Sequence, residues 1–512
     1  MSIREFLSGD QRFRTLFALS LAAGCGALLP LTLAPFGWWP LGMLSIGGWF
    51  WLLNLLPRNA AALGFAYGIG KFGVGVSWVY VSMRLYGEAS VPLAAFLVLL
   101  FVAGLSVFTL LQAWLYSRVA GGCAGLLGAG LFAAVWVLFE WLLTWFLTGF
   151  PWLYPGYAHL NTPLVHLVPL GGVSLASLGI VATSAFLVVA LNNALALSVR
   201  GRSAALLLAA APWLAGLALS PMEWVRPASS HKAALVQGNV DQSIKWQAEN
   251  RMPIVERYLD MTGPYWGHDL IVWPEAAITL YEHQAAAVLE ALDERGERTG
   301  TTVLFGIPTA ERTPGGDWFV YNSALATGVG SGRYTKRRLV PFGDYVPFEG
   351  LLRGLIGFFD LPMSAFRPGP WELGTLDAGV GRAAVGICYE IAYGELMRAS
   401  AAQADLLVTI TNDTWFGASI GPLQHAQIAR ARAVENGRWL LRGTNNGVTA
   451  IVDHRGRIVS ALPQFERDVL AGEFRIMEGR TPYNRHGDAW LVALCFAGLL
   501  AALLKAQART AR

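Results

Sequence analysis

Long apolar runs dominate the first part of the chain, and one more returns near its end. A helix needs about 20 residues to cross the hydrocarbon layer of a membrane, and eight runs approach that length. We predict eight membrane-spanning helices, at residues 15–34, 39–56, 61–83, 92–117, 123–147, 165–197, 204–220 and 489–504. The first run can also be read as a cleaved signal ending at Cys25, but the apolar sequence beyond it favours a retained helix.

The pattern changes between residues 226 and 487, where short β-rich runs alternate with longer helical segments. Strands are predicted at 233–237, 270–273, 302–307, 320–327, 383–388, 406–411, 439–444 and 447–452. Helices are predicted at 244–262, 285–298, 393–402 and 423–436, with a hairpin loop at 328–332. This alternation predicts a layered α/β domain.

The two patterns divide the chain into three predicted parts. These are a bundle of seven helices at 1–225, a polar domain at 226–487, and an eighth helix with a tail at 488–512. Only 14 Asp, Glu, Lys and Arg residues precede Arg226, in a chain that is 54% hydrophobic and 14% charged. This composition excludes an ordinary soluble globular protein. The net charge of +4 is spread along the chain, so nucleic acid is not a predicted partner.

The positions of the cations predict the orientation of the spans. Basic residues precede the first predicted span and follow even-numbered ones, namely Arg4, Arg12, Arg14, Arg58, Arg118, Arg200, Arg202, Lys505, Arg509 and Arg512. Because cytoplasmic loops are enriched in Lys and Arg, we expect both termini in the cytoplasm. The polar domain then lies on the other side, which is the periplasm for a bacterial inner membrane.

Two ionisable residues, Lys71 and Glu140, fall inside predicted spans. Charged groups are costly in lipid, so such residues often indicate a functional site. Snorkelling toward the interface, or a structural pair between helices, explains them equally well. The sequence leaves both interpretations open.

Three residues near the ends of predicted strands have side chains suited to acyl transfer. Cys388 stands between a β-like run and a helical segment, where a strand-to-helix turn exposes a nucleophile. Glu275 can accept the thiol proton, and the ammonium of Lys336 can stabilise an oxyanion. Taken singly, each has an ordinary explanation: packing for the cysteine, a solvated or capping carboxylate for the glutamate, and an exposed basic cluster for the lysine.

The sequence around these residues resembles the three signature blocks of the nitrilase, or carbon–nitrogen hydrolase, superfamily. The blocks are Trp273-Pro-Glu275, Lys336 with Leu339-Val-Pro-Phe-Gly-Asp344, and Gly386-Ile-Cys-Tyr-Glu390. The likeness extends through Thr411-Asn-Asp-Thr-Trp-Phe-Gly417, Gln424-His425, Arg430, Arg432 and Glu435. With seven predicted spans before the domain and one after it, nearly the whole chain is similar to the apolipoprotein N-acyltransferases.

The resemblance implies an αββα sandwich, a triad of Glu275, Lys336 and Cys388, and an active site in the periplasm. It also implies two substrates. A phospholipid gives an acyl group to Cys388 as a thioester, and the amine of an S-diacylglyceryl-cysteine at a lipoprotein N-terminus then receives it. An ester donor and an amine acceptor suit such ping-pong covalent catalysis. No metal-ligand spacing or phosphate loop is present, so no cofactor is predicted.

Four further residues are site candidates by the same resemblance. Glu390 and Asp344 match carboxylates that orient the triad, although the family usually has Glu at the position of Asp344, which is one methylene longer. Trp246 matches a tryptophan that contacts substrate. Tyr389 would line the acyl pocket, and its N–H would join Lys336 at the oxyanion. Ordinary aromatic packing is the alternative for Trp246 and Tyr389.

The segment 348–362 is unusually apolar for a loop and rich in glycine. It is either an arm that enters the membrane interface or a lid that packs on the sandwich.

Two other functions remain as alternatives: a membrane-anchored amidase, in which water resolves the thioester, and an inactive scaffold that binds lipoproteins. We expect a monomer.

Overall fold

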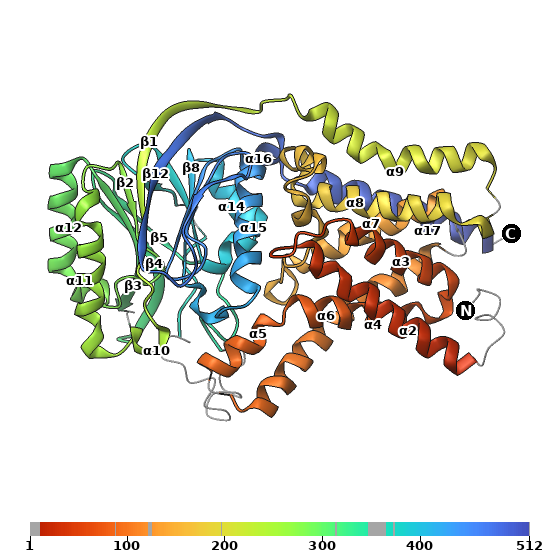
Figure 1. The fold of residues 1–512 in the computed structure, drawn as a ribbon, viewed down its shortest axis with the longest axis horizontal. Coiled ribbons are helices and arrows are strands. Elements are labelled where there is room, and N and C mark those ends of the chain that lie inside the picture. Colours follow the sequence, from red (N-terminus) through yellow and green to blue (C-terminus); the bar gives the residue numbers. More distant parts are fainter. Residues whose placement is uncertain are drawn as a thin grey trace. The chain divides into compact units, whose positions relative to one another are not determined.

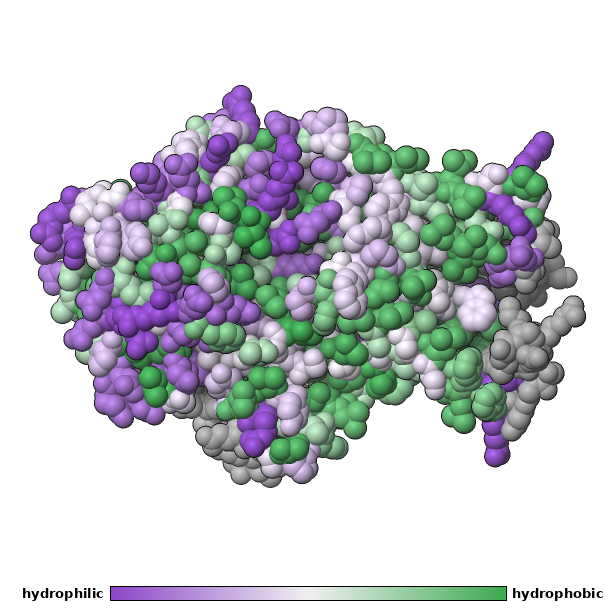
Figure 2. Space-filling view, viewed as in Figure 1, coloured by the Kyte–Doolittle hydropathy of each residue, from purple (hydrophilic) through white to green (hydrophobic). Residues whose placement is uncertain are grey.

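The computed structural model describes residues 11–87, 89–120, 125–195, 197–312, 315–346, 365–371 and 374–510. The chain divides into two compact units (Figure 1). Unit 1 comprises Met1–Tyr80, Val91–Met222 and Asp488–Arg512, and unit 2 comprises Val81–Ser90 and Glu223–Gly487. Hydrophilic side chains gather over unit 2, whereas the visible surface of unit 1 is mostly hydrophobic (Figure 2).

Unit 1 is helical. Its main helices are α2 (Gln11–Leu28), α3 (Leu41–Leu55), α4 (Ala60–Gly75), α6 (Val91–Ala120), α7 (Leu126–Leu143), α8 (Val168–Leu191), α9 (Val199–Leu219) and α17 (Ala489–Thr510). Among the described residues, five helical stretches are long and apolar enough to cross a membrane: Arg12–Thr32, Val91–Ala120, Leu126–Leu143, Pro163–Leu191 and Val199–Leu219. The apolar helices Leu41–Leu55 and Ala489–Leu504 are shorter.

The third predicted span, at 61–83, differs most from the observed helices. α4 has 16 residues and ends at Gly75, and α5 (Trp78–Val81) and a π-helical turn (Ser82–Tyr86) follow it. The chain from Val81 to Ser90 belongs to unit 2, where the Ser82 hydroxyl donates to the Trp415 carbonyl at 2.7 Å. The apolar run at 61–83 therefore predicted one continuous helix, whereas the observed helix ends at Gly75 and the chain passes from unit 1 into unit 2 at Val81.

Glycines allow the helices of unit 1 to approach closely. Gly64 and Gly68, one turn apart on α4, lie against α6 at Thr109, and a Cβ atom on either would run into that helix. Gly70 lies equally close to Ala23 of α2. Small residues at such contacts are typical of helices that pack in lipid, where van der Waals contact drives association.

The two ionisable residues of the predicted spans are both buried in the bundle. Lys71 is 4% exposed and Glu140 is 3% exposed. Trp136 connects them, because its indole N–H donates to Glu140 at 2.7 Å and its ring lies 5.6 Å from the Lys71 ammonium. Neither side chain reaches the outer surface, so the snorkelling interpretation is wrong.

Unit 2 contains two six-stranded sheets. The first has the order β12 (Asp468–Gly479), β1 (Val225–Gln237), β2 (Leu270–Val272), β3 (Thr302–Arg312), β4 (Trp318–Gly328) and β5 (Gly332–Thr335). The second has the order β11 (Ile458–Ala461), β10 (Ala450–Val452), β9 (Leu440–Thr444), β8 (Leu406–Thr411), β7 (Arg382–Ile387) and β6 (Leu376–Asp377). The central strands β1, β2 and β3 run parallel, as do β7, β8 and β9.

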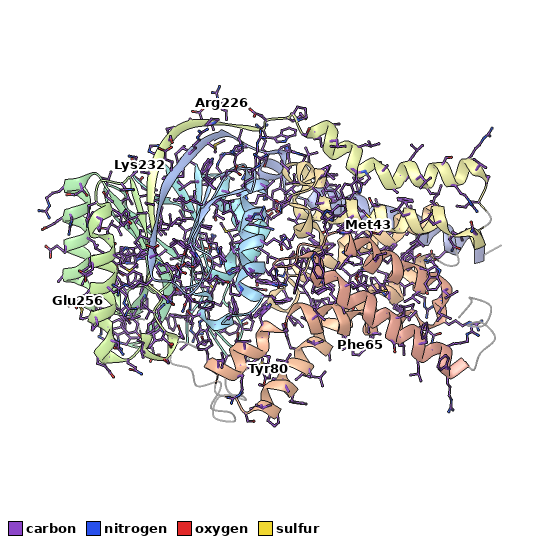
Figure 3. The ribbon with its side chains drawn as sticks, viewed as in Figure 1. Met43, Phe65, Tyr80, Arg226, Lys232 and Glu256 are labelled. Atoms are coloured by element: carbon purple, nitrogen blue, oxygen red, sulfur yellow. The ribbon has the colours of Figure 1, made fainter. Side chains whose placement is uncertain are left out.

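Helices cover the outer faces of both sheets (Figure 1). α11 (Arg251–Thr262) and α12 (Ala286–Thr299) share an apolar core with the first sheet, and α14 (Gly394–Ala401) and α15 (Gly421–Asn436) share one with the second. The sheets meet where Gly443 of β9 touches Val272 of β2. Arg226 and Lys232 on β1 and Glu256 on α11 lie exposed on the outside (Figure 3). The expected αββα sandwich is confirmed.

All eight predicted strands are present, but four others were not predicted. β5, β6 and β11 have only two to four residues. β12 is long, but it is an edge strand with an irregular burial pattern and charged residues such as Glu473 and Arg475. Its hydrogen-bonded pairing with β1, rather than its own sequence pattern, identifies it as a strand. The predicted helix at 244–262 is divided into α10 (Gln242–Lys245) and α11.

Candidate active site

Glu275 lies just beyond the end of β2. The Trp273 N–H still donates to the Leu304 carbonyl of β3 at 2.8 Å, and the Pro274 carbonyl still accepts from the Gly306 N–H of β3 at 3.2 Å. Glu275 is 7% exposed, and its carboxylate accepts hydrogen bonds from two uncharged donors. Its Oε1 accepts from the Asn322 amide at 2.8 Å, and its Oε2 accepts from the Asn412 main-chain N–H at 2.9 Å. Both oxygens are thereby fixed in direction.

Lys336 directly follows β5 and is 1% exposed. Its Nζ lies 2.8 Å from Asp344 Oδ2 and 3.4 Å from Glu275 Oε1. Burial opposes a charge here, but the carboxylates of Asp344 and Glu275 outweigh it and hold the pKa of Lys336 well above its usual range. Lys336 is therefore an ammonium, and the shorter side chain of Asp344 does reach it.

Cys388 follows β7 and begins a 3-10 helix, Cys388–Ala392. Its φ of 55° is a left-handed conformation that is strained for a residue with a side chain. Burial, followed by the charge of Glu275, raises the pKa of the thiol far above its usual range, against the opposing effects of Lys336 and of a hydrogen bond with Thr411. The thiol is therefore protonated at rest, and attack requires a base.

Glu390 connects the lysine segment to the cysteine turn, and it is fully buried. Its Oε1 accepts from the main-chain N–H groups of Arg337 at 2.8 Å and Arg338 at 3.0 Å. Its Oε2 accepts from the Ile387 N–H at 2.9 Å and the Tyr334 hydroxyl at 3.0 Å. The residues just after Lys336 and just before Cys388 are thus held by one carboxylate.

A second buried group supports the turn from the side of α15. His425 Nε2 lies 3.2 Å from the Cys388 carbonyl, and its Nδ1 lies 2.9 Å from Asp413 Oδ1. Arg442 donates to the other oxygen of Asp413 at 2.7 Å. Burial would raise the pKa of Asp413, but Arg442 and His425 hold it below its usual range. Burial and Arg442 lower the pKa of His425.

Several residues of the site carried no sequence signal of their own. Lys245 is fully buried, and its Nζ donates to the Glu275 carbonyl at 3.0 Å. Burial lowers the pKa of Lys245 to about 8, against the opposing charges of Glu275 and Cys388. Asn322, on β4, stands in no recognised block. Asn412 does lie in the block 411–417, which could have pointed to it.

Trp246 and Tyr389 are adjacent in sequence to site residues. Trp246 is half-buried and follows Lys245 at the end of α10. Tyr389 follows Cys388, is 7% exposed, and packs edge-on against Tyr393 with 5.4 Å between ring centroids. The segment 348–362, expected to form an arm or lid, lies outside the described residues.

The structure brings Glu275, Lys336 and Cys388 together from the ends of three strands. Both Glu275 and Lys336 act electrostatically on the Cys388 thiol. A carboxylate, an ammonium and a protonated thiol in one buried place can attack a carbonyl carbon, accept the thiol proton and stabilise the resulting oxyanion.

The chain is similar to two described families. Residues 232–479 match the family described as carbon-nitrogen hydrolase, and residues 25–186 match the one described as apolipoprotein N-acyltransferase N-terminal domain. The first of these matches covers most of unit 2 and includes Glu275, Lys336 and Cys388.

Whole-length relatives are also found. The chain is 46% identical over 494 residues to the apolipoprotein N-acyltransferase of Pseudomonas paraeruginosa, covering 96% of each chain. It is 39% identical over 481 residues to the apolipoprotein N-acyltransferase of Vibrio parahaemolyticus, covering 91% of this chain and 93% of the relative. Among solved structures, Saccharomyces cerevisiae Nit3, a nitrilase-superfamily member, matches 50% of this chain and 92% of its own, with 19% identity and a TM-score of 0.36.

Proposed function

The chain belongs to the apolipoprotein N-acyltransferase family, and on that premise we propose that Glu275, Lys336 and Cys388 carry out its acyl transfer in two steps. The substrates are a phospholipid, which donates the acyl group, and an apolipoprotein whose N-terminal cysteine carries a diacylglyceryl group. The observation that carries this proposal is the convergence of the three side chains, with Glu275 Oε1 3.4 Å from Lys336 Nζ and both acting on the buried thiol.

In the first step the Cys388 sulfur attacks the carbonyl carbon of a phospholipid ester, and Glu275 accepts the thiol proton. The carbonyl oxygen becomes an oxyanion, which the Lys336 ammonium and the Tyr389 N–H stabilise. When the carbon–oxygen bond to the glycerol breaks, the leaving alkoxide takes the proton from Glu275. The products are a thioester on Cys388 and a lysophospholipid.

In the second step the free amine of the diacylglyceryl-cysteine attacks the thioester carbon. Glu275 accepts a proton from the nitrogen, and the carbon–sulfur bond breaks as the amide forms. The proton returns from Glu275 to the sulfur, which restores the resting thiol. The high pKa of Cys388 favours this return and makes Glu275 necessary in both steps.

The remaining candidates have supporting roles in this proposal. Asp344 holds Lys336 in place, and Glu390 aligns the segments that carry Lys336 and Cys388. Tyr389 lines the acyl pocket, and Trp246 contacts substrate. Tyr389 is supported by its place beside the nucleophile, and Trp246 by its place beside Lys245, whose ammonium reaches Glu275.

We assign residues 1–225 and 488–512 to a bundle of eight spans in the bacterial inner membrane. The catalytic domain at 226–487 then faces the periplasm, and both termini face the cytoplasm. The distribution of Lys and Arg supports this orientation. A monomer contains every residue that the two steps require.

The test is a reaction of the full-length protein in mixed micelles with phospholipid and a diacylglyceryl-cysteine peptide. Mass spectrometry should find an acyl group on Cys388 without the peptide, and an N-acylated peptide once it is added. Cys388→Ala should abolish both products. Cys495→Ala, at a buried free cysteine of α17, is the matched control and should retain both.

Other outcomes separate the alternatives. A thioester that releases fatty acid without N-acylation would indicate an amidase-like hydrolase, and binding of the peptide with neither product would indicate a scaffold. N-acylation by Cys388→Ala would disprove the thioester mechanism.

A further inference from the structure

A second buried lysine lies beside the three residues of the proposed triad. Lys245 extends from α10, and its ammonium donates to the main-chain carbonyl of Glu275 at 3.0 Å. No part of the residue is exposed. A lysine is rarely buried in this way unless its charge or its donors are used, because removing an ammonium from water is expensive.

The charges around the site explain why a second cation is needed. Lys336 is shared between two carboxylates, Glu275 and Asp344. With the thiol neutral, these three groups carry one net negative charge in a buried place. The ammonium of Lys245 cancels that charge. An uncompensated buried charge would instead be removed by protonation of a carboxylate.

The other charged groups nearby do not supply this compensation. Asp413 also acts on Cys388, but it has its own partners in Arg442 and His425. Glu390 is held by three main-chain N–H groups and the Tyr334 hydroxyl. Lys245 itself interacts with Glu275 and with Cys388 when that thiol is ionised.

We infer that Lys245 is a positioning residue that fixes the main chain of Glu275, the proposed base, and supplies the positive charge that balances the two carboxylates around Lys336. The inference deepens the proposed function and rests on it. Lys245 also favours the thiolate of Cys388, because its charge adds to that of Lys336. A lysine that only fills space would affect folding but not the pH at which the site works.

Two substitutions separate charge from packing. Lys245→Met preserves the length of the side chain and removes both the charge and the donor. Lys245→Gln keeps a hydrogen-bond donor and removes only the charge. If the Met variant does not fold, the Gln variant is used for the test. Lys232→Met is the matched control, because Lys232 is exposed on the outside of β1 (Figure 3).

Two rates are measured against pH with the full-length protein, the first in mixed micelles that contain phospholipid and the second in detergent micelles without it. One is acylation of Cys388, and the other is alkylation of Cys388 by iodoacetamide in detergent alone, each read from the Cys388 peptide by mass spectrometry. At neutral pH, where the Lys245 ammonium is charged, Lys245→Met and Lys245→Gln should lower both rates about tenfold. The loss should shrink above about pH 8, where Lys245 of the unaltered protein also becomes neutral. Lys232→Met should match the unaltered protein.

The outcomes distinguish the inference from the proposed function. Rates that fall equally at every pH, or profiles that do not move, would overturn the role of Lys245. Alkylation needs no lipid substrate. A loss of alkylation confined to pH values below about 8, in a protein that never forms the thioester, would overturn the proposed function while supporting the charge role of Lys245.

Discussion

Glu390 is the residue through which the two halves of the candidate site are aligned. It accepts four hydrogen bonds and donates none, which is the pattern of an ionised carboxylate. Glu390→Gln preserves its size but turns an NH2 group toward buried N–H donors, at a cost of roughly 1–3 kcal/mol for a donor left unpaired. We expect Cys388 acylation to slow by about 10- to 100-fold, because small displacements of reacting groups are costly.

Glu395→Gln is the matched control for this prediction. Glu395 is an exposed glutamate on α14 that pairs with Arg398. Its substitution should leave both acylation and the melting temperature nearly unchanged. Equal effects of the two substitutions would show that Glu390 has no special role in alignment.

The raised pKa of the Cys388 thiol predicts how its rate of alkylation depends on pH. Its pKa is raised, so the sulfur keeps its proton to higher pH, and the thiolate fraction at any given pH is lower than in free cysteine. Alkylation of Cys388 should therefore be slower than that of free cysteine at about pH 8, and should still increase toward about pH 10. Peptide mass spectrometry after timed iodoacetamide treatment measures this. A plateau already reached by about pH 8 would contradict it.

At the scale of elements, Gly306 on β3 determines where Glu275 lies. A Cβ atom at Gly306 would run into the main chain from Pro274 to Ala276, which cannot move aside as a flexible side chain can. Gly306→Ala should displace the carboxylate and slow Cys388 acylation by about 10- to 100-fold. Gly263→Ala, where the same atom meets open space, is the control and should retain full activity.

The contact between α4 and α6 gives a matched pair of substitutions in unit 1. A Cβ atom at Gly68 would overlap Ser106 and Thr109 of α6, whereas one at Gly73 on the same helix meets no atom within 4 Å. Gly68→Ala should lower the melting temperature in detergent, consistent with about 1–3 kcal/mol for overpacking. Gly73→Ala should leave it unchanged or raise it slightly, because Ala favours helix over Gly. Equal melting temperatures would show that the α4–α6 contact adapts freely.

At the scale of the whole molecule, the proposed orientation can be tested with single cysteines in a cysteine-free background. Glu256→Cys on α11 and Arg200→Cys at the start of α9 are both exposed positions. With the outer membrane permeabilised, a membrane-impermeant maleimide should label the cysteine at 256 in intact cells. The cysteine at 200 should react only after lysis. The reverse result would invert the proposed topology.

The order of the elements and the three blocks of the site could be predicted from the sequence because both are local properties. An apolar run or a strand signal is readable within one segment, and Glu275, Lys336 and Cys388 each stand in a contiguous motif. β12 was missed because an edge strand half exposed to water has no clear period, and only its register with β1 makes it a strand. The break after Gly75 was missed because the sequence stays apolar where the chain leaves the bundle.

The sequence by itself therefore determined the membrane and α/β parts, the family resemblance and the three side chains that we propose to react. Only the tertiary structure decided how those side chains are supported. Lys245, Asn322 and Asn412 are far from Glu275 in sequence, and folding of the two sheets brings them against it. Hydrogen bonds and charge compensation depend on distances of a few ångströms across the fold, and no pattern along the chain encodes those distances.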